Sequence, residues 1–363
     1  MKKIALSMVA IVSATIVSAD ANLKQKEQSS FFEKIHTKGD MRLRYETIEK
    51  GESSNKYRTR YRFRYNLDVD VTDEILVESA ISSGRYNPTS GNVSFKDDDN
   101  WADYFVDELK MDIADIKYSF GNSWIRAGKS KHHIYRPIKT QLIWDNDIRL
   151  EGLNYGYKSD EHMIRFGVNR VHRESGYKTG DDIHILVAQY VNTQKINDAK
   201  LNFGGGYYYY DDIKGNTVQS KNKFKQNSND GSVYTEDYGI LELFGEYQNK
   251  DLMIGMPFKA AFTLAYNTLA DDDNLGYDLS VELKATEKLK LVATYRDIDK
   301  DAVYGAHNDS DFSGGGTDSS GYYIKGKYKF AKNVDLGAWL NWSKLGDAET
   351  DYHRVQLDTI LKF

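Results

Sequence analysis

Hydrophobic and polar side chains alternate along much of this chain. In residues 57–71 the odd positions carry tyrosine, threonine, phenylalanine, leucine or valine, and the even positions carry arginine, asparagine or aspartate. Residues 35–47, 289–296 and 322–330 broadly repeat the alternation. An α-helix with 3.6 residues per turn would scatter these positions around its surface, whereas a β-strand places them on two opposite faces. The pattern therefore predicts long amphipathic strands.

These strands are too long and too charged for an ordinary soluble β-sandwich. The alternating segments reach 11–15 residues, whereas strands of soluble proteins are mostly five or six residues long. Such a length suits a tilted strand that crosses ~25 Å of hydrocarbon, with apolar side chains toward lipid and charged ones toward enclosed water. Because a flat sheet would leave unpaired edges in lipid, the sheet must close. The predicted fold is all-β, a closed antiparallel transmembrane β-barrel.

Sixteen segments qualify as strands, and counts of fourteen and eighteen stay open. They are 34–48, 57–72, 74–84, 105–119, 122–133, 146–158, 161–173, 181–194, 199–211, 235–249, 257–268, 275–286, 288–298, 320–331, 333–344 and 352–363. Tight turns such as 72–74 and 159–161 alternate with longer, Gly-, Asp- and Asn-rich connections such as 84–104, 211–234 and 299–319. This asymmetry is typical of outer-membrane barrels and places both chain ends on the periplasmic side.

The first residues have the features of an export signal. Lys2 and Lys3 precede an apolar stretch at 4–17, and small residues follow up to Ala19, with Ala21 as an alternative cleavage position. No later run of ~18 apolar residues predicts a transmembrane helix. The predicted organisation is a signal peptide at 1–19, a periplasmic lead-in at 20–32 and an outer-membrane β-barrel domain at 33–363.

The composition narrows the function classes. The chain has no cysteine, which excludes disulfides, thiolate metal ligands and a cysteine nucleophile. Its 49 Lys and Arg against 54 Asp and Glu give a net charge of −5, so the positive charge typical of a nucleic-acid-binding protein is missing. No Gly-x-Ser-x-Gly segment occurs, and adjacent histidines such as His132 and His133 would point to opposite sides of a strand, which is poor for one metal. We therefore predict no enzyme, no metal and no cofactor.

Several segments resemble a known family. The chain ends in an alternating strand that finishes on Phe363, which resembles the signal used by outer-membrane assembly machinery. The family segments are GDMRLRYE at 39–46, RYRFRYNL at 60–67, SGRYNPTSGN at 83–92, AGKS at 127–130 and WDNDIRLEGL at 144–153. Together they resemble the bacterial putative porin family, most strongly over 33–160. The resemblance implies a pore for small hydrophilic solutes in the outer membrane of a Gram-negative bacterium, and it does not identify the solute.

Arginines dominate the polar face of the first two strands. Six of the fifteen arginines lie there with one parity: Arg42, Arg44, Arg58, Arg60, Arg62 and Arg64. A second basic stripe consists of Lys325, Lys327 and Lys329. A strip of guanidinium groups along a pore wall would favour anionic solutes. In the alternative interpretation, Glu46, Asp68, Asp70 and Asp358 neutralise the arginines, which then brace the wall. The two roles are compatible.

The segment 131–145 is the candidate constriction loop. It is apolar for an exposed loop and contains His132, His133 and Arg136. In general porins the loop at this position folds into the pore, and this expectation is an analogy at the level of the family. Loop 84–104 is the second candidate. Tyr208, Tyr210 and Tyr323 have inward parity and could offer stacking surfaces to a solute or simply fill the wall.

The expected partners follow from the predicted location. They are outer-membrane lipid, lipopolysaccharide and small hydrophilic solutes, with no nucleic acid, and a homotrimer by analogy with other sixteen-stranded porins. The acidic runs 97–99 and 271–273 are either solvated loops or sites for divalent cations that bridge lipopolysaccharide. Two alternatives to a pore remain, namely an outer-membrane barrel hydrolase and a plugged structural or adhesive barrel.

Overall fold

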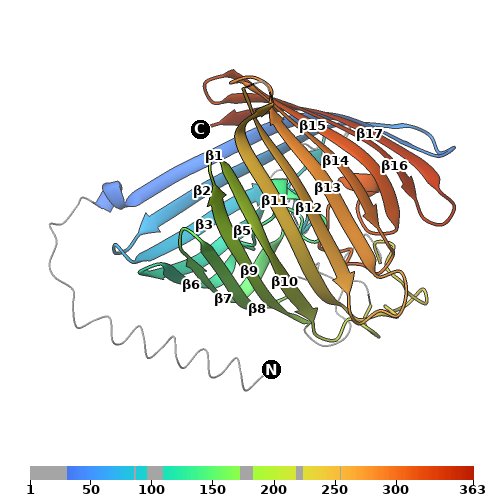
Figure 1. Ribbon diagram of the computed structural model, residues 1–363, viewed down its shortest axis with the longest axis horizontal. Coiled ribbons are helices and arrows are strands. Elements are labelled where there is room, and N and C mark those ends of the chain that lie inside the picture. Colours follow the sequence, from blue (N-terminus) through green and yellow to red (C-terminus); the bar gives the residue numbers. More distant parts are fainter. Residues whose placement is uncertain (1–30, 86, 96–108, 172–182, 218–223, 254) are drawn as a thin grey trace.

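The protein forms a closed antiparallel β-barrel. The computed structural model describes residues 31–85, 87–95, 109–171, 183–217, 224–253 and 255–363. Within these residues, sixteen strands each pair with their neighbours in the chain, and the last strand closes against the first along the register Asp40↔Lys362 to Lys50↔Tyr352 (Figure 1). A further strand of two residues, β4 (Val93–Ser94), pairs with β2. The predicted fold class and the count of sixteen are confirmed.

The bounds of the barrel strands lie within a few residues of the prediction. The strands are β1 (Ile35–Lys50), β2 (Lys56–Asp70), β3 (Ile75–Ser83), β5 (Leu109–Phe120), β6 (Ser123–Lys131), β7 (Arg149–Lys158), β8 (His162–Arg170), β9 (His184–Ile196), β10 (Ala199–Tyr210), β11 (Gly239–Met253), β12 (Met256–Asn267), β13 (Leu275–Lys284), β14 (Leu289–Ile298), β15 (Ser319–Ala331), β16 (Val334–Leu345) and β17 (Thr350–Lys362). The short 3-10 segments are η2 (Phe31–Lys34), η3 (Pro137–Lys139) and η4 (Phe312–Gly314). No helix of the described residues is long and apolar enough to span a membrane.

Strand β11 starts four residues later than predicted, at Gly239 instead of 235. The carboxylate of Asp237 accepts hydrogen bonds from the backbone N–H groups of Ile213 and Lys214 at 3.0 and 2.8 Å. These bonds hold the residues before Gly239 in the preceding loop, although their alternation extends the strand pattern. The predicted signal peptide and residues 20–30 of the lead-in lie outside the described residues and stay predictions.

The two ends of the barrel differ as the sequence predicts. Short connections of described residues join alternate strand pairs at one end, at 71–74, 121–122, 159–161, 197–198, 285–288 and 332–333. The first strand begins and the last strand ends at this same end. The opposite end, at the lower right of Figure 1, carries the described parts of the long loops, at 84–85, 87–95, 132–148, 211–217, 224–238 and 299–318, together with shorter connections.

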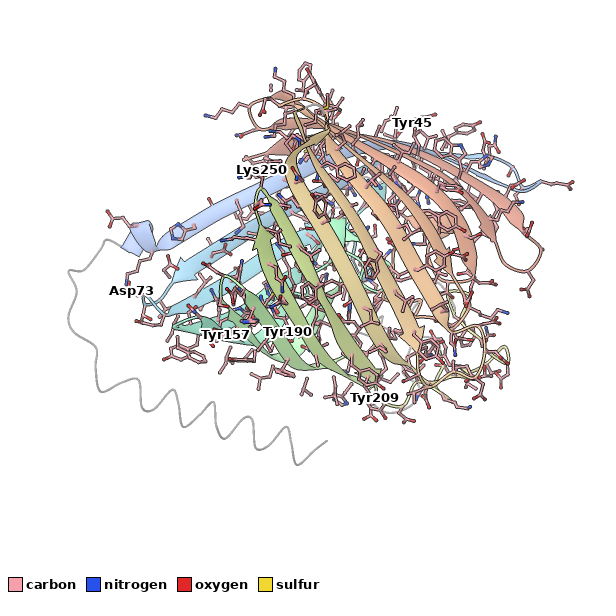
Figure 2. All side chains as sticks on the ribbon, in the orientation of Figure 1. Tyr45, Asp73, Tyr157, Tyr190, Tyr209 and Lys250 are labelled. Carbon is pink, nitrogen blue, oxygen red and sulfur yellow. The ribbon has the colours of Figure 1, made fainter. Side chains whose placement is uncertain are left out.

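Outward and inward side chains alternate along the wall. Met41, Leu43 and Tyr45 on β1 are 37–46% exposed, whereas Arg44 between them is 5% exposed. Tyr45 and Tyr190 lie on the outer surface of the wall (Figure 2). The outer face is therefore apolar and aromatic, as a lipid-facing surface requires.

A β-bulge reverses this parity within β5. Ala80 of β3 pairs with Ile113, whereas the next residue, Ile81, pairs with Met111, so that Asp112 is an extra residue. Outward positions change from odd before the bulge, at Met111, to even after it, at Ile116, and each side chain is 54% exposed. A bulge inserts one residue on one strand and reverses the sides that follow. The strand predicted at 105–119 exists, but its alternation is broken at this point.

An apolar core lies inside the barrel, formed by loops that fold inward. Leu142 and Trp144 of loop 132–148 pack with Tyr304 of loop 299–318 against the inward side chains of β9 and β10. The buried members of this core are Ile134, Leu142, Ile143, Trp144, Ile148, Leu150, Val171, Ile183, Ile185, Val187, Tyr208, Tyr210, Ile213, Tyr234, Tyr238, Ile240, Ala265, Ile298, Ala302, Val303 and Tyr304. On this side of the barrel, inward positions near the long loops are apolar as well as outward ones.

Gly206 on β10 makes room for one of these aromatic side chains. A Cβ atom at this position would lie 2.7 Å from the Tyr208 hydroxyl and 3.0 Å from the carbonyl oxygen of Ala188. The missing side chain lets the Tyr208 ring lie along the wall, where its hydroxyl donates to Glu242 at 2.6 Å.

Candidate functional site

The six predicted arginines lie together on the inner wall. Direct cross-strand pairs join Arg42 to Arg62 and Arg44 to Arg60. The next inward-facing pairs along the two strands are Asp40 with Arg64 on one side and Glu46 with Arg58 on the other. We call Arg42, Arg44, Arg58, Arg60, Arg62 and Arg64 the arginine ladder. Because like charges directly opposite each other destabilise a strand pair, the ladder requires nearby carboxylates.

Carboxylates on the strands supply part of this charge. Asp358 on β17 accepts two hydrogen bonds from Arg44, at 2.7 and 2.8 Å, and Asp40 lies 2.6 Å from Arg62. Glu46 is completely buried and lies 2.7 Å from Arg58, 3.2 Å from Arg60 and 2.7 Å from Arg354. Planar guanidinium groups suit such paired contacts.

Two of the acids predicted to neutralise the arginines pair with other side chains instead. Asp68 pairs with Lys38 at 2.8 Å, and Asp70 pairs with His36 at 2.8 Å. Both pairs lie at the short-turn end of β1 and β2, beyond the arginines. Of the four acids predicted to neutralise the arginines, Glu46 and Asp358 therefore pair with the ladder, whereas Asp68 and Asp70 pair with Lys38 and His36.

The inward loops supply the remaining contacts to the ladder. Asp147 of loop 132–148 pairs with Arg64. Asp311 of loop 299–318 lies 3.5 Å from Arg44 and 3.0 Å from Arg354. Asn92 of loop 84–95 accepts a hydrogen bond from Arg42 through its side-chain oxygen. Three loops from separate parts of the chain therefore meet on one strip of wall.

The loop carboxylates are ionised in this setting. Burial alone would raise the pKa of Asp147, but Arg64, Arg62 and Arg149 outweigh it and hold the pKa of this carboxyl far below its usual value. Arg354 and Arg44 likewise hold the pKa of Asp311 well below its usual value against the effect of burial. With Arg354, seven arginines face five carboxylates (Asp40, Glu46, Asp147, Asp311 and Asp358), which leaves a net charge of about +2 on the strip.

Sequence reasoning missed Arg354, Asn92, Asp147 and Asp311. Arg354 shares the inward parity of Gln356 and Asp358 on the last strand, so the closure of that strand against β1 was an available signal. No comparable signal identified the three loop residues, because loop side chains have no strand parity.

The lysine stripe lies apart from the ladder. The Lys325 ammonium group sits 4.5 Å from the ring centre of Tyr323 and 5.4 Å from that of Trp339, which are cation–π contacts. Lys327 pairs with Asp335 at 3.0 Å, and Lys329 is exposed near the short turn of β15 and β16. Among the described residues, no ion pair joins these lysines to the ladder.

The loop 132–148 crosses the interior. The backbone N–H and carbonyl of Tyr135 bond to the Gln189 side chain on β9, at 2.8 and 2.9 Å. The N–H of Ile138 donates to Glu246 on β11 at 2.7 Å, and the Thr140 hydroxyl donates to Asp278 on β13. The loop that leaves β6 thus reaches the wall formed by β9 to β13 before it returns to β7.

The predicted constriction residues mainly hold this loop in shape. His132 lies 5.8 Å from the ring of Trp144, and Arg136 donates to the carbonyls of Thr140 and Trp144 at 3.1 and 2.7 Å. The His133 carbonyl accepts from Arg165 at 3.0 Å. Burial, with nearby arginines, lowers the pKa of His133 to about 3 and that of His132 well below its usual value, so both rings are neutral at pH 7.

The interior tyrosines do not offer stacking surfaces. Tyr208 and Tyr210 are 0% and 1% exposed beneath the inward loops, and the Tyr210 hydroxyl lies 2.9 Å from Nδ1 of His307. Tyr323 is 3% exposed and is covered by Phe312 and Lys325. The stacking interpretation is wrong because the loops that the barrel encloses cover these rings.

Comparisons with known proteins agree with this architecture. A family model described as putative porin matches residues 45–238 and 270–363. Among solved structures, OprB of Pseudomonas putida aligns with a TM-score of 0.59 and 12% identity over 92% of this chain and 95% of that chain. A loop-deletion mutant of the outer-membrane protein OmpT of Vibrio cholerae gives 0.51 and 12% over 91% and 100%. A mutant of Rhodopseudomonas blastica porin gives 0.51 and 13% over 91% and 100%. No match was found among curated proteins.

Proposed function

Because the chain belongs to the putative porin family and folds as an outer-membrane barrel, we propose that small hydrophilic solutes diffuse passively through its interior with a preference for anions. The observation that carries the preference is the strip where seven arginines face five carboxylates, which keeps a net charge of about +2 on one wall. Fixed charge of one sign along a narrow aqueous path raises the local concentration of counter-ions.

The ladder supports stepwise passage of a carboxylate or phosphate group. Successive inward positions on a strand are about 7 Å apart, so an anionic group leaving one guanidinium is already near the next. The two loop acids, Asp147 and Asp311, occupy such positions in the resting protein. A solute anion competes with them, which keeps its binding weak enough for release.

Reversal potentials in a salt gradient across a planar bilayer test the preference. The wild type is expected to favour anions, and Arg60→Ala and Arg62→Ala are expected to reduce that preference because each removes one charge from the strip. Lys344→Ala is the matched control, since its exposed ammonium group pairs with Glu349 and Asp351 at the loop end. A cation preference that neither arginine substitution alters would reject the proposal.

One observation favours a second candidate, a plugged structural barrel. The apolar core formed by residues of 132–148, 211–217, 224–238 and 299–318 fills the interior beside β9 to β12. A barrel whose loops closed the whole cross-section would insert into bilayers without conductance. Single-channel recording separates the two functions.

We also propose that the protein forms a homotrimer, by analogy with other sixteen-stranded porins. Strands β3, β6 and β8 have nine residues each, whereas β1 has sixteen, so the wall is low on one side. This low side supports the predicted homotrimer as a surface for neighbouring copies, and the mass of the native complex in detergent tests it. The acidic run 97–99 lies outside the described residues, and the cation role of 271–273 stays a prediction.

A further inference from the structure

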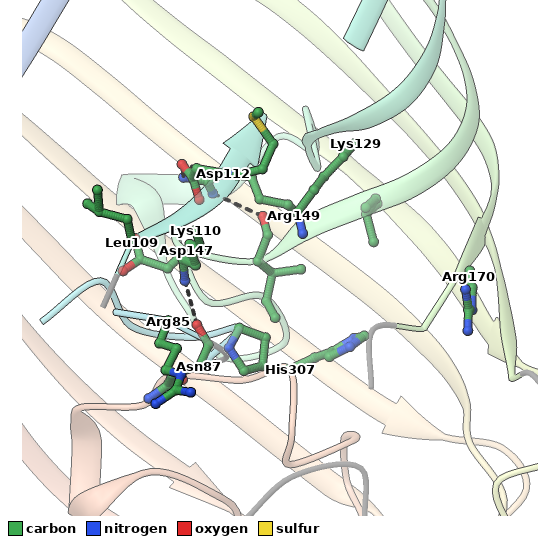
Figure 3. Close-up of a pocket in the computed structure, with 14 residues that line it drawn as sticks. Arg85, Asn87, Leu109, Lys110, Asp112, Lys129, Asp147, Arg149, Arg170 and His307 are labelled. Atoms are coloured by element: carbon green, nitrogen blue, oxygen red, sulfur yellow. Dashed lines mark hydrogen bonds and ion pairs between the residues drawn. The ribbon is translucent and has the colours of Figure 1, made fainter. Parts of the chain in front are cut away.

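A cavity of about 400 Å³ lies at the loop end of β5, β6 and β7. Figure 3 shows that its walls come from these strands and from inward loops that include Asn87, Asp147 and His307. Five cationic side chains and two carboxylates line it. A cavity of this size lies at the small end of the range that holds small-molecule ligands.

Both carboxylates of the cavity are already bound to arginines. Asp112, the extra residue of the β-bulge, accepts from Nε and Nη2 of Arg149 at 3.1 and 2.8 Å. Asp147 pairs with Arg64 of the ladder and also accepts from the N–H of Gly91 at 3.3 Å. Among the described residues, neither acid forms a direct ion pair with another cation of the cavity.

Lys110 has no such partner. Its ammonium group donates to the carbonyls of Asn87 and Ser90, at 2.5 and 3.4 Å, and no carboxylate of the described residues lies within ion-pair distance of it. Because an ammonium group has three donors, one remains for a ligand. An ammonium group held among carbonyls, with no carboxylate of the described residues in contact with it, favours an anion.

The rest of the wall limits the kind of anion. Leu109 contributes apolar surface, and Ile148 and Leu150 border the cavity with only 2% of each residue exposed. Inorganic phosphate would leave this surface uncovered. A short apolar body attached to a charged group would cover it, with a favourable contribution for each buried methylene.

We propose that this cavity is a binding site for a small organic anion, in which Lys110 holds a carboxylate or phosphate group and the apolar wall receives the body of the molecule. The proposal deepens the proposed function and rests on it, because the site lies beside the arginine ladder and shares Asp147 with it. The same chemistry would also hold a phosphate group of lipopolysaccharide at the loop end of the barrel.

Ion current through the purified protein in phosphatidylcholine bilayers tests the site, with butyrate, acetate and inorganic phosphate as probes added on the loop side. We expect butyrate to reduce the chloride current saturably. Acetate should require about tenfold higher concentration, because it lacks two methylene groups, and phosphate should lie closer to acetate than to butyrate. A current that falls without saturation for all three probes overturns the proposal.

Lys110→Gln is expected to raise the half-saturating butyrate concentration about tenfold, the effect of one lost charged contact. Lys344→Gln removes the same charge at the same end of the barrel outside the cavity and should leave saturation unchanged. Equal saturation in Lys110→Gln and the wild type overturns the role of Lys110. If Lys110→Gln does not fold, as judged by the loss of heat-dependent gel mobility, the comparison of butyrate with acetate in the wild type decides whether the cavity binds organic anions.

A second bilayer, with lipopolysaccharide on the loop side, distinguishes a free organic anion from a lipid phosphate as the ligand. Butyrate saturation that persists there assigns the site to a free solute, and saturation that disappears assigns it to the lipid phosphate. Failure of this site is distinguishable from failure of the proposed function. Anion preference without butyrate saturation rejects the site alone, whereas saturation without anion preference rejects the selectivity alone.

Discussion

The two sides of the barrel interior are built from opposite chemistry. On the wall of β1, β2 and β17, inward positions carry arginines that meet the loops through single side chains such as Asp147 and Asp311. On the wall of β9 to β12, inward positions near the loops carry side chains such as Val187 and Ile240, which pack against Trp144 and its neighbours. Both walls follow the same strand alternation, so alternation alone does not decide how the interior is filled.

The two walls have different roles toward the loops: the apolar wall holds them in place, and the charged wall binds the acidic side chains that they carry. Loop 132–148 is anchored on the apolar wall by Leu142 and Trp144, and it presents Asp147 to the arginine ladder. Loop 299–318 likewise buries Val303 and Tyr304 and presents Asp311. Buried apolar contacts do not exchange with dissolved ions, whereas ion pairs do. The apolar wall therefore holds the loops in place, and the charged wall is the side at which we propose that solute anions compete.

The strongest way to break this arrangement is to remove the anchor. Trp144→Ala deletes a side chain that is 1% exposed and contacts the rings of Tyr208 and His307 at 5.2 and 5.7 Å. We expect a loss of about 3–5 kcal/mol in the stability of the inward loop and a higher single-channel conductance. Trp342→Ala, on the outer face at 44% exposure, is the control. Unchanged conductance in a folded Trp144→Ala barrel would show that the loop does not limit the pore.

A substitution on the charged wall is expected to have an intermediate effect on stability and on ion selectivity. Glu46→Gln removes the only charge shared by Arg58, Arg60 and Arg354 among the described residues and raises the net charge of the strip from about +2 to about +3. It should cost about 1–3 kcal/mol and strengthen the anion preference in reversal-potential measurements. Glu49→Gln, at an exposed pair with His353, should change neither quantity. A weaker anion preference in Glu46→Gln would contradict the assignment of the strip.

The smallest expected effect is a pH dependence of the stability of loop 132–148. Burial lowers the pKa of His132 and His133 in the folded state, so the stability that their neutral rings give is present above about pH 6.5 and is lost as the pH falls toward about 3. Asp145 acts in the opposite sense, because burial and Asp147 raise its pKa. We expect the heat-modifiability transition to fall by roughly 2 °C between pH 7 and pH 5.

His132→Phe keeps the contact with Trp144 and should flatten this dependence. His36→Phe, which removes an exposed histidine paired with Asp70, should leave it intact. A transition that rises on acidification would show that Asp145 dominates.

Much of the barrel wall was predictable because strand parity is a local property. The run 57–71 fixes its own two faces, and with 35–47 it defines the arginine ladder before any contact is known. The exception is β5, where Asp112 forms a bulge whose presence depends on the register with β3. The apolar inward positions of β9 and β10 also departed from the simple pattern, because they pack on loops instead of facing water.

The contents of the interior were less predictable. The apolar composition of 131–145 and the analogy with general porins predicted that this segment enters the barrel. His132, His133 and Arg136 instead stabilise the loop, and Asp147, just beyond that segment, reaches the ladder. Tyr208 and Tyr210 had the right parity for a solute-facing surface, but the enclosed loops bury them. Parity specifies the side of the wall, and it does not specify what lies on that side.

By itself, the sequence determined the strand faces, the closed sheet, the asymmetry of turns and loops, and the cluster of arginines on one wall, because each depends on residues adjacent in the chain or in neighbouring strands. Only the tertiary structure decided that Glu46 and Arg354 meet, that Asp147 and Asp311 reach the ladder, and that Lys110 lines a cavity in which no carboxylate of the described residues touches it. These contacts join residues up to 308 positions apart. They form because barrel closure and the burial of apolar loops bring the segments together, which no local pattern encodes.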